Sequence, residues 1–412
     1  MTMSSGYVIV GGGLAGAQAA QKLREEGADG PITLLCSESE LPYVRPPLSK
    51  EYLKDAVPRD SVFVHDRSWY EDHDVEVLLD SPVEFFRPDR REVLLAGGRS
   101  LTYSRLLLAM GSSARRLDVQ GADLDGVHTL RNLADCERIK QAVAGGQRMV
   151  VIGAGWIGLE VASAAREAGL DVTVIEVAEH PLERVLGPKV GDIFTDLHVQ
   201  HGVSVLTGSK VTELVGRSGR VTGVQLGSGV VVPADVVIVG VGASPNTAVA
   251  EASDARVDDG IVVDEYLALG PPGVYAAGDV ASAFHRHYRR HIRVEHWDNA
   301  RKQGAAAALN MLDQRTEYDR LPFFYSDQYD LGLEYTGWAP PGGVDRVVLR
   351  GDVDAFRFIA FWVSQHRVVA AMNVNIWDVR PQLEDVIRSG AQVEREQLED
   401  PDVDLAVLAK TA

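Results

Sequence analysis

The sequence predicts an α/β protein with two doubly wound domains, each built on a mainly parallel sheet, followed by a small C-terminal α+β domain. An apolar strand that runs into a GxGxxG turn occurs at residue 7 and again at residue 149. After about residue 320, aromatic and β-branched runs alternate with turn residues, a pattern typical of a smaller sheet domain. A chain of 412 residues is also too long for one compact core.

The first copy, residues 7–16, reads YVIVGGGLAG. Gly11 allows a tight turn, Gly13 lets backbone N–H groups approach a pyrophosphate, and Gly16 lets the next helix pack closely on the sheet. A helical segment and the strand ITLL follow, with Glu38 beyond, where a carboxylate can bind ribose hydroxyls. Taken alone, this copy also fits a strand-to-helix turn that binds nothing.

The second copy, residues 149–176, repeats the same order of elements with Gly153, Gly155 and Gly158 in the turn. Chance would have to place one pattern twice, so two dinucleotide-binding domains become the preferred interpretation. Glu176 ends the second strand and can accept hydrogen bonds from both ribose hydroxyls, whereas it would repel the phosphate of NADPH. This turn therefore favours NADH.

Other segments carry clear strand or helix patterns. RLLLAMGSSARRL, at 105–117, reads as a sheet strand that leads into a crossover, and residues 295–312 read as a helix. Shorter strands are predicted at 75–79, 83–86, 92–95, 203–206, 221–225 and 236–239, and the tail from 381 is acidic and helix-prone.

Composition limits the function classes. A net charge of −18 disfavours binding to nucleic acid or to an anionic membrane, because both would repel the protein. The two cysteines, Cys36 and Cys136, are far apart and cannot form a CxxC redox pair, so we expect two ordinary buried thiols. No signal peptide or spanning segment is recognisable, no motif predicts metal ligands, and we expect a soluble cytoplasmic protein.

A further strand ends in Ala276-Ala277-Gly278-Asp279, and we expect a helix to follow it. Gly278 would allow close backbone approach, and Asp279 could hold a polyol hydroxyl such as those of the ribitol chain of a flavin. The alternative is a Gly-Asp turn that caps the next helix.

These motifs together resemble a family. YVIVGGGLAG, LPYVRPPLSK, LLLAMGS, VVIGAGWIGLE, VYAAGDV, EHWDNARKQG and FFYSDQY occur in the order found in FAD- and NADH-dependent ferredoxin reductases of bacterial oxygenase systems, the putidaredoxin reductase type. Apoptosis-inducing factor is a more distant likeness. The resemblance implies a glutathione-reductase-like architecture. Its parts would be a split FAD-binding domain (1–113 and 244–319), an NADH-binding domain (114–243) and a C-terminal α+β domain (320–412).

The resemblance also implies roles in FAD binding. The helix beginning near Trp297 would point its positive end at the flavin carbonyls, although a core tryptophan is an open alternative. The other implied contacts are Gly11, Gly13, Ala15 and Gly16 at the pyrophosphate, Glu38 at the adenosine ribose, Val83 and Arg131 on the adenine and flavin sides, Arg45 and Lys50 against the flavin, and Gly278 and Asp279 at the ribitol.

Lys50 and Glu160 are the predicted catalytic pair. A hydride that arrives at flavin N5 leaves excess negative charge on the ring, and a nearby ammonium stabilises it. The family pairs this lysine with this glutamate. From the residues alone, a solvated loop lysine and a glutamate that favours a helix N-terminus remain open.

On the NADH side, the resemblance adds Arg184 and Gly242 to the second turn, although Arg184 could also be a surface residue without a ligand. Two positions depart from the family pattern. Met110 replaces the usual threonine of ATG, and Tyr325 replaces the usual tryptophan before SDQ, beside the nicotinamide. Tyrosine keeps a flat ring for stacking but loses indole surface.

The resemblance implies a 2Fe-2S ferredoxin as electron acceptor and a monomer or weak dimer. The basic run at 285–293 could steer an acidic ferredoxin through Arg286, Arg289, Arg290 and Arg293, or be an ordinary solvated face. Three alternatives remain. A disulfide reductase lacks its cysteine pair here, an NADH oxidase or peroxidase needs a reactive thiol or rapid oxygen consumption, and a redox-controlled signalling protein would resemble apoptosis-inducing factor.

Overall fold

The computed structural model describes residues 6–340 and 342–410. Within these residues the chain divides into two compact units. Unit 1 comprises residues 6–45, 58–113 and 244–320, and unit 2 comprises residues 46–57, 114–243, 321–340 and 342–410. The RPPLSK loop, from its first proline onward, thus groups with unit 2.

Unit 1 is centred on a five-stranded parallel sheet of order β19-β7-β1-β2-β3. The strands are short apolar runs that are largely buried, as expected where helices cover a parallel sheet. β1 lies in the middle, so the glycine turn that follows it opens at the carboxyl edge of the sheet. The strands are β1 (Tyr7–Val10), β2 (Ile32–Leu35), β3 (Val75–Leu78), β7 (Arg105–Leu108) and β19 (Val274–Ala276).

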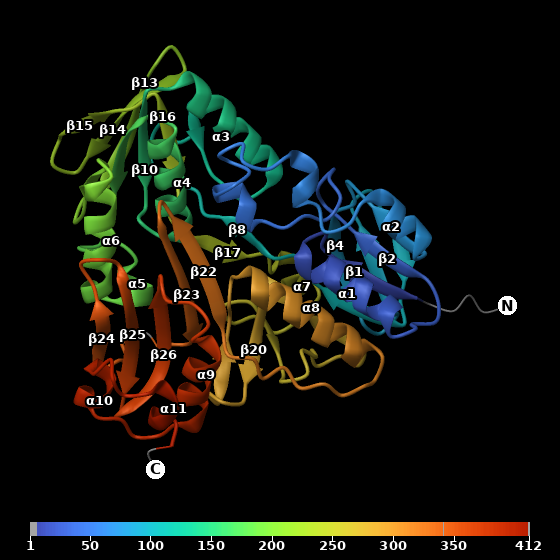
Figure 1. Cartoon of the computed structure of the whole chain (residues 1–412). Helices are drawn as coiled ribbons and strands as arrows, with labels where there is room; N and C mark the ends of the chain where they lie inside the picture. Colours follow the sequence, from blue (N-terminus) through green and yellow to red (C-terminus); the bar gives the residue numbers. More distant parts are fainter. Residues whose placement is uncertain (1–5, 341, 411–412) are drawn as a thin grey trace. The chain divides into compact units, whose positions relative to one another are not determined.

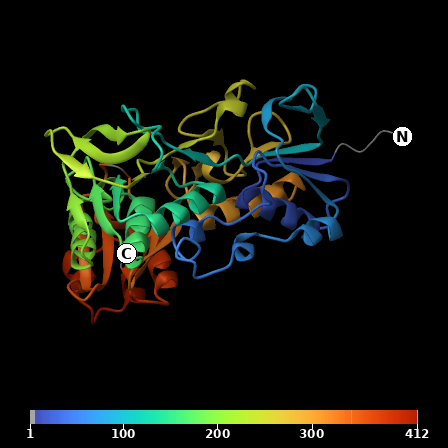
Figure 2. The same cartoon turned by 90° about the horizontal axis from the view of Figure 1, so that it is seen from above.

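Two helices of unit 1 lie side by side, α1 (Leu14–Glu25) and α8 (Trp297–Met311), as Figures 1 and 2 show. Their approach depends on small residues. A Cβ added at Gly304 of α8 would lie 2.2 Å from the carbonyl oxygen of Ala15 of α1. A larger side chain there would separate the helices. The helix predicted over 295–312 is therefore present, with bounds two residues and one residue shorter at its ends.

Smaller elements complete unit 1, and they correct one prediction. No helix follows Asp279. The chain makes a 3₁₀ turn at Gly278–Val280, in which Gly278 has φ +80°, and then enters a hairpin. After the positive φ of Gly278 the chain continues into β20, which pairs with strands of another sheet, instead of into a helix. The elements are β4 (Val83–Arg87), β5 (Glu92–Leu95) and β6 (Ser100–Thr102), β18 (Ile261–Val263), β20 (Ala281–His285) and β21 (Arg290–Ile292), α2 (Arg67–Asp72), α7 (Ala248–Glu251) and the 3₁₀ turn Arg59–Val62.

Unit 2 contains a second five-stranded parallel sheet, of order β12-β11-β10-β16-β9. Helix α4 (Trp156–Glu167) follows β10 in the same way as α1 follows β1. An antiparallel sheet of β13 (Val211–Arg217), β14 (Arg220–Leu226) and β15 (Val231–Pro233) lies within the same chain segment. The remaining elements are β9 (Val127–His128), β10 (Arg148–Ile152), β11 (Asp171–Ile175), β12 (Ser204–Leu206), β16 (Val236–Val239), α3 (Leu133–Gly145), α5 (Glu183–Leu186), α6 (Pro188–Gln200) and the 3₁₀ turn Pro46–Ser49. β8 (Ser112–Ala114) and β17 (Ala243–Pro245) form a separate two-stranded sheet.

The C-terminal part of unit 2 is an antiparallel sheet of order β22-β23-β26-β25-β24, and helices α9, α10 and α11 pack against it or against one another (Figure 1). The indole N–H of the buried Trp362 in β25 donates to the carbonyl of Leu186, 3.1 Å away, which ties this sheet to the end of α5. The predicted α+β character of this part is confirmed. Its elements are β22 (Phe323–Gln328), β23 (Leu331–Gly337), β24 (Arg346–Asp352), β25 (Arg357–Ser364), β26 (Arg367–Val374), α9 (Arg380–Ser389), α10 (Arg395–Glu399) and α11 (Leu405–Leu408).

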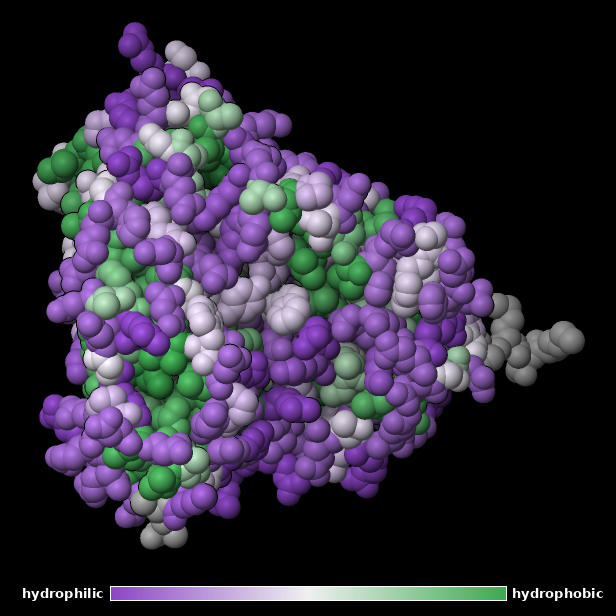
Figure 3. Space-filling model, viewed as in Figure 1, coloured by the Kyte–Doolittle hydropathy of each residue, from purple (hydrophilic) through white to green (hydrophobic). Residues whose placement is uncertain are grey.

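The face of the molecule in Figure 3 is mainly hydrophilic, with hydrophobic areas scattered across it. In the part of the chain that the structure describes, none of the helices is both long and apolar enough to pass through a bilayer.

Candidate functional site

Both glycine turns have the backbone that a dinucleotide pyrophosphate requires. Gly11 and Gly153 adopt φ +122° and φ +100°, a region that L side chains avoid. A Cβ added at Gly16 would lie 2.2 Å from the carbonyl oxygen of Gly11, and one at Gly158 would lie 2.1 Å from that of Gly153. Close helix-to-turn packing therefore requires glycine in both copies.

The residues in front of helices α1 and α4 fit a phosphate group. Gly13 and Gly155 are the N-caps, and among the described residues no side chain caps either helix. A Cβ added at either glycine would meet no described atom within 4 Å. The helix N-termini therefore keep their first N–H groups turned toward open space, where their partial positive charge favours an anion.

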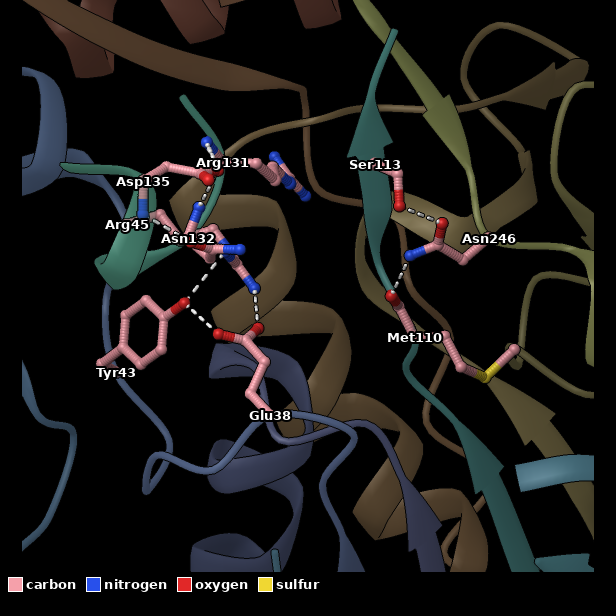
Figure 4. Close-up of polar contacts among 9 residues, drawn as sticks. All are labelled: Glu38, Tyr43, Arg45, Met110, Ser113, Arg131, Asn132, Asp135 and Asn246. Atoms are coloured by element: carbon pink, nitrogen blue, oxygen red, sulfur yellow. Dashed lines mark hydrogen bonds and ion pairs between the residues drawn. The ribbon is translucent and has the colours of Figure 1, made fainter. Parts of the chain in front are cut away.

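Glu38 is held by its neighbours beyond β2, as Figure 4 shows. The Tyr43 hydroxyl donates to one carboxylate oxygen at 2.5 Å, and the Arg45 guanidinium pairs with the other at 3.1 Å. The three side chains make a polar cluster in unit 1. Sequence reasoning identified Glu38 and Arg45 but missed Tyr43, although it lies within the LPYVRPPLSK motif.

Two backbone N–H groups hold the carboxylate of Glu176 beside the second turn. Its carboxylate accepts hydrogen bonds from the N–H of Ala154, within the glycine turn, at 2.6 Å and from the N–H of Ala178 at 2.9 Å. The negative charge thus lies directly beside the turn, which is where the sequence placed a group that would repel a 2′-phosphate.

Lys50 and Glu160 form an ion pair within unit 2. The Lys50 ammonium lies 2.8 Å from Oε1 of Glu160, and the two side chains are only 8% and 5% exposed. The Ser49 hydroxyl donates to Oε2 at 2.5 Å, and the Ser326 hydroxyl donates to Oε1 at 2.6 Å. Burial of two opposite charges requires such extra hydrogen bonds. Sequence reasoning missed both serines, although they lie inside its two most specific motifs, RPPLSK and SDQ.

Tyr325, in β22, lies beside this pair. The Lys50 ammonium is 5.5 Å from the centre of the Tyr325 ring, within the range of a cation–π contact. Burial raises the pKa of the Tyr325 hydroxyl to about 12, so the hydroxyl remains protonated at neutral pH. The structure therefore brings Lys50, Glu160 and Tyr325 together, as three of the predicted site residues.

The predicted ribitol-side residues lie in unit 1. The Gly278 N–H donates to Gln303 of α8 at 2.9 Å, and Asp279 follows in the 3₁₀ turn. Trp297 begins α8 and is half-buried, with the guanidinium of Arg301 4.8 Å from its ring centre. Trp297 is thus not a fully buried core tryptophan, the alternative that the sequence left open.

The remaining predicted residues are spread over both units. In unit 2, the N–H of Arg131 donates to Asp135, whose carboxylate also takes part in the capping box of α3 (Figure 4), and Arg184 is exposed on α5. Gly242 has φ +103° in the loop after β16, and its carbonyl accepts from the N–H of Arg115 at 2.9 Å. In unit 1, Val83 begins β4.

Met110, one of the two departures from the family pattern, lies in unit 1. Its side chain packs against the unit 1 core, and its carbonyl accepts a hydrogen bond from the Asn246 amide at 2.8 Å. The Ser113 hydroxyl donates to the oxygen of the same amide at 2.7 Å (Figure 4). Methionine is therefore accommodated as a packing residue at this position.

The basic run at 285–293 forms the β20–β21 hairpin of unit 1. Arg286 pairs with Glu317 at 2.5 Å, and Arg293 pairs with Asp259 at 3.1 Å and with Glu295. These carboxylates offset much of the charge of the two arginines. Arg289 and Arg290 are exposed at the turn, so both side chains are accessible to a partner.

Both cysteines are free, buried thiols. Burial raises the pKa of Cys36 and of Cys136 to about 12, so neither supplies a thiolate nucleophile near neutral pH. The expectation of two ordinary buried thiols agrees with this.

Residues 5–304 match the model of the pyridine nucleotide-disulphide oxidoreductase family, and residues 323–409 match that of the reductase C-terminal family. The chain therefore belongs to the pyridine nucleotide-disulphide oxidoreductases, a family that binds FAD and a nicotinamide nucleotide. It is an oxidoreductase, and its C-terminal sheet domain places it with the ferredoxin-reductase type within that family.

Individual relatives support the same family assignment. Rhodocoxin reductase of Rhodococcus erythropolis is 37% identical over 398 residues, which cover 97% of this chain and 93% of that protein. Putidaredoxin reductase of Pseudomonas putida is 36% identical over 380 residues, covering 91% of this chain and 90% of its own. The crystal structure of the covalent putidaredoxin reductase–putidaredoxin complex matches with a TM-score of 0.94 at 35% identity, covering 99% of both chains. The family resemblance and the predicted fold class are confirmed.

Proposed function

We propose that this protein is an FAD-containing ferredoxin reductase that takes hydride from NADH and passes single electrons to a 2Fe-2S ferredoxin, which in turn feeds a monooxygenase or dioxygenase. The observation that carries the proposal is the buried Lys50–Glu160 pair beside Tyr325. A buried ion pair contributes little to stability compared with apolar packing, so its presence beside a nucleotide turn favours a chemical role.

In this proposal the two glycine turns hold two different nucleotides. Gly11, Gly13, Ala15 and Gly16 would hold the pyrophosphate of FAD, with Glu38 at its adenosine ribose, because a cation-supported carboxylate can still accept from ribose hydroxyls. The turn at Gly153, Gly155 and Gly158 would hold NADH, with Glu176 disfavouring NADPH. Bound FAD would supply the chemistry that converts a two-electron donor into one-electron deliveries.

In this proposal the protein's own side chains stabilise the developing charge and hold one another in position. The Lys50 ammonium would face the negative charge that develops during hydride transfer, and Glu160 would fix its direction through the 2.8 Å contact. Tyr325 would offer its flat ring for stacking in place of tryptophan. Arg45, Val83, Arg131, Gly278, Asp279 and Trp297 would complete the FAD site, and Arg184 and Gly242 the NADH site.

Reduction of the flavin by NADH tests the proposal. The purified yellow protein should bleach rapidly with NADH and slowly with NADPH, and Lys50→Met should slow the limiting rate by about 10²-fold, the effect of removing one preorganised electrostatic group. Lys54→Met is the matched control, since Lys54 pairs with Glu167 on the partly exposed surface. If neither nucleotide bleaches the flavin, the proposal fails. If Lys50→Met and Glu160→Ala both keep the wild-type rate of flavin bleaching, the catalytic role assigned to this pair is wrong.

The electron acceptor would dock near Arg289 and Arg290, supported by their exposure and by the usual acidity of ferredoxins. Reversing both charges to Glu should lower the rate of ferredoxin reduction by about tenfold at low salt and leave reduction of a neutral quinone unchanged. Arg90→Glu with Arg91→Glu is the matched control, because these arginines are also adjacent, exposed and at a hairpin turn of unit 1. Equal losses in both double variants would place the docking surface elsewhere.

A cytoplasmic location and a monomeric or weakly dimeric state belong to the same proposal. Sedimentation of the oxidised and NADH-reduced protein tests the second point. A mass shift on reduction together with negligible ferredoxin turnover would instead favour the signalling function related to apoptosis-inducing factor.

A further inference from the structure

A chain of hydrogen bonds leads away from the Lys50–Glu160 pair into the interior of unit 2. Ser326 Oγ donates to Glu160, and the Gln328 amide nitrogen donates to Ser326 Oγ at 3.2 Å. The Gln328 amide oxygen contacts Nε2 of His198, in α6, at 2.9 Å. His198, Gln328, Ser326 and Glu160 are at most 5% exposed, so water does not compete for these contacts.

The chemistry of the partners fixes the direction of this chain. The Gln328 oxygen can only accept, so Nε2 of His198 must carry the proton. Neutral His198 then has a bare Nδ1, which faces the hydroxyl of Tyr329 at 3.3 Å and accepts from it. Every donor therefore points toward Glu160, in the order Tyr329, His198, Gln328, Ser326.

We propose that His198 is a positioning residue for the reaction: by donating from Nε2 it fixes the orientation of the Gln328 amide, and thereby directs the Ser326 hydroxyl at the Glu160 carboxylate that holds Lys50. This inference rests on the function proposed above. It assigns roles to two buried groups, His198 and Gln328, that the binding of either nucleotide does not require.

His198 determines the orientation of the Gln328 amide. With the Nε2–H donor present, the amide oxygen faces His198 and the amide NH₂ faces Ser326. Without that donor, the amide gains nothing from this orientation and can rotate by 180°. Its oxygen would then face Ser326 and compete with Glu160 for the serine hydroxyl. Glu160 would lose one of the two hydroxyl donors that hold it against Lys50.

His198 is kept neutral by its surroundings. Burial, with a smaller contribution from the nearby His201, lowers the pKa of His198 to about 4, although its hydrogen bond to Gln328 opposes the shift. The groups around it are the Tyr329 ring and hydroxyl, Gln328, and His201, which stacks on Tyr329 with ring centres 3.7 Å apart. None of these carries a negative charge that would favour the imidazolium at neutral pH.

A double-mutant cycle on flavin bleaching by NADH tests the inference. His198→Leu should lower the limiting rate by about two- to tenfold, which is the ratio for loss of one neutral hydrogen bond. The NADH concentration for half-maximal rate should not change, because Glu176 and the glycine turn are untouched. In a Ser326→Ala background, His198→Leu should have no further effect, since its path to Glu160 is already cut.

Two further variants separate positioning from simple packing. His198→Gln keeps an N–H donor facing Gln328 and should restore at least half of the wild-type rate. His201→Phe is the matched control, because it keeps the stack on Tyr329 but lies outside the chain. If His198→Leu lowers the rate equally with and without Ser326, or if His198→Gln is as slow as His198→Leu, the positioning role is wrong. Gln328→Leu gives an independent break in the chain should His198→Leu fold poorly.

A spectroscopic measurement needs no turnover. In the flavin-loaded protein labelled with ¹⁵N-histidine, long-range ¹H–¹⁵N spectra should show His198 as the Nε2–H tautomer, without titration between pH 8 and pH 5. An Nδ1–H tautomer, or titration near pH 6.5, would overturn the proposed donor order. If wild-type protein fails to bleach with NADH, the proposed function fails, while the tautomer still decides the donor order.

Discussion

The two glycine turns share a backbone but differ in the residue that follows the second strand of each copy. The strand registers pair Val10 with Leu35 and Ile152 with Ile175, so Cys36 corresponds in position to Glu176. Glu176 accepts from the turn itself, whereas a Cβ added at Gly12 in the first turn would lie 2.4 Å from the Cys36 sulfur. The first copy places its acid two residues later, as Glu38.

The helices after the two turns also differ in one side chain. Gln18 and Glu160 each follow the third glycine by two residues. Gln18 bonds only to the neighbouring Gln21 at 2.7 Å among the contacts described for its side chain, whereas Glu160 is buried and receives Lys50. The two copies thus share a turn backbone but differ in the side chains around it, and in the proposed function these side chains select the nucleotide of each copy and stabilise charge at the second.

The largest expected effect comes from a methyl group between turn and helix. Gly16→Ala and Gly158→Ala each place a Cβ about 2 Å from a turn carbonyl, so the backbone must move. Gly16→Ala should weaken FAD binding by roughly 10²-fold and so lower the flavin content of the purified protein. Gly158→Ala should leave the protein yellow but weaken NADH binding by roughly 10²-fold. Absorbance and NADH titration measure the two effects.

Gly145→Ala is the control for both variants, because it ends α3 and its Cβ would meet no described atom within 4 Å. Loss of flavin in Gly158→Ala alone would reverse the assignment of the two turns.

A smaller effect is expected where the added methyl meets open space. Gly13→Ala and Gly155→Ala should leave the temperature of unfolding of the ligand-free protein unchanged, since no described atom is displaced. The methyl would occupy the approach to a pyrophosphate, so FAD affinity should fall about tenfold in the first variant and NADH affinity about tenfold in the second. Unchanged affinities would show that the ligand phosphates lie elsewhere.

Glu176→Gln tests the acid of the second copy. Glutamine keeps one acceptor for the turn N–H but removes the charge, so the ratio of kcat/KM for NADH over NADPH should fall by about tenfold. Glu38→Gln, in the first copy, should leave this ratio unchanged. An equal shift in both variants would contradict the assignment of NADH to the second turn.

The smallest expected effect concerns Cys36, which stands where the second copy has Glu176. With a pKa raised to about 12 by burial, only about one molecule in ten thousand carries the thiolate at pH 8, and the fraction grows only as the pH rises toward that value. Iodoacetamide should therefore label neither Cys36 nor Cys136 between pH 7 and pH 9. Mass spectrometry after unfolding in guanidinium should find both labelled, and labelling of Cys36 in the native protein would mean that the first turn opens.

Periodic patterns predicted most of the fold. The glycine turns, α1, α4, the strands beside them and α8 are local features, because strand alternation and turn chemistry depend on neighbours in sequence. The helix expected after Asp279 was wrong, because the positive φ of Gly278 and pairing of β20 with β18 and β21 override local propensity. The hairpin carrying the basic run was missed for the same reason.

The sequence by itself determined the class of protein, the two glycine turns and the catalytic candidates, since glycines at fixed spacing and a few specific motifs require only local geometry. Only the tertiary structure decided which groups meet. The Lys50–Glu160 pair was predicted through the family resemblance, but Ser49 reaches Glu160 across 111 residues of chain and His198 reaches Gln328 across 130, and neither contact was predicted. Such contacts depend on how the sheets and helices of unit 2 pack, and no spacing within the sequence encodes them.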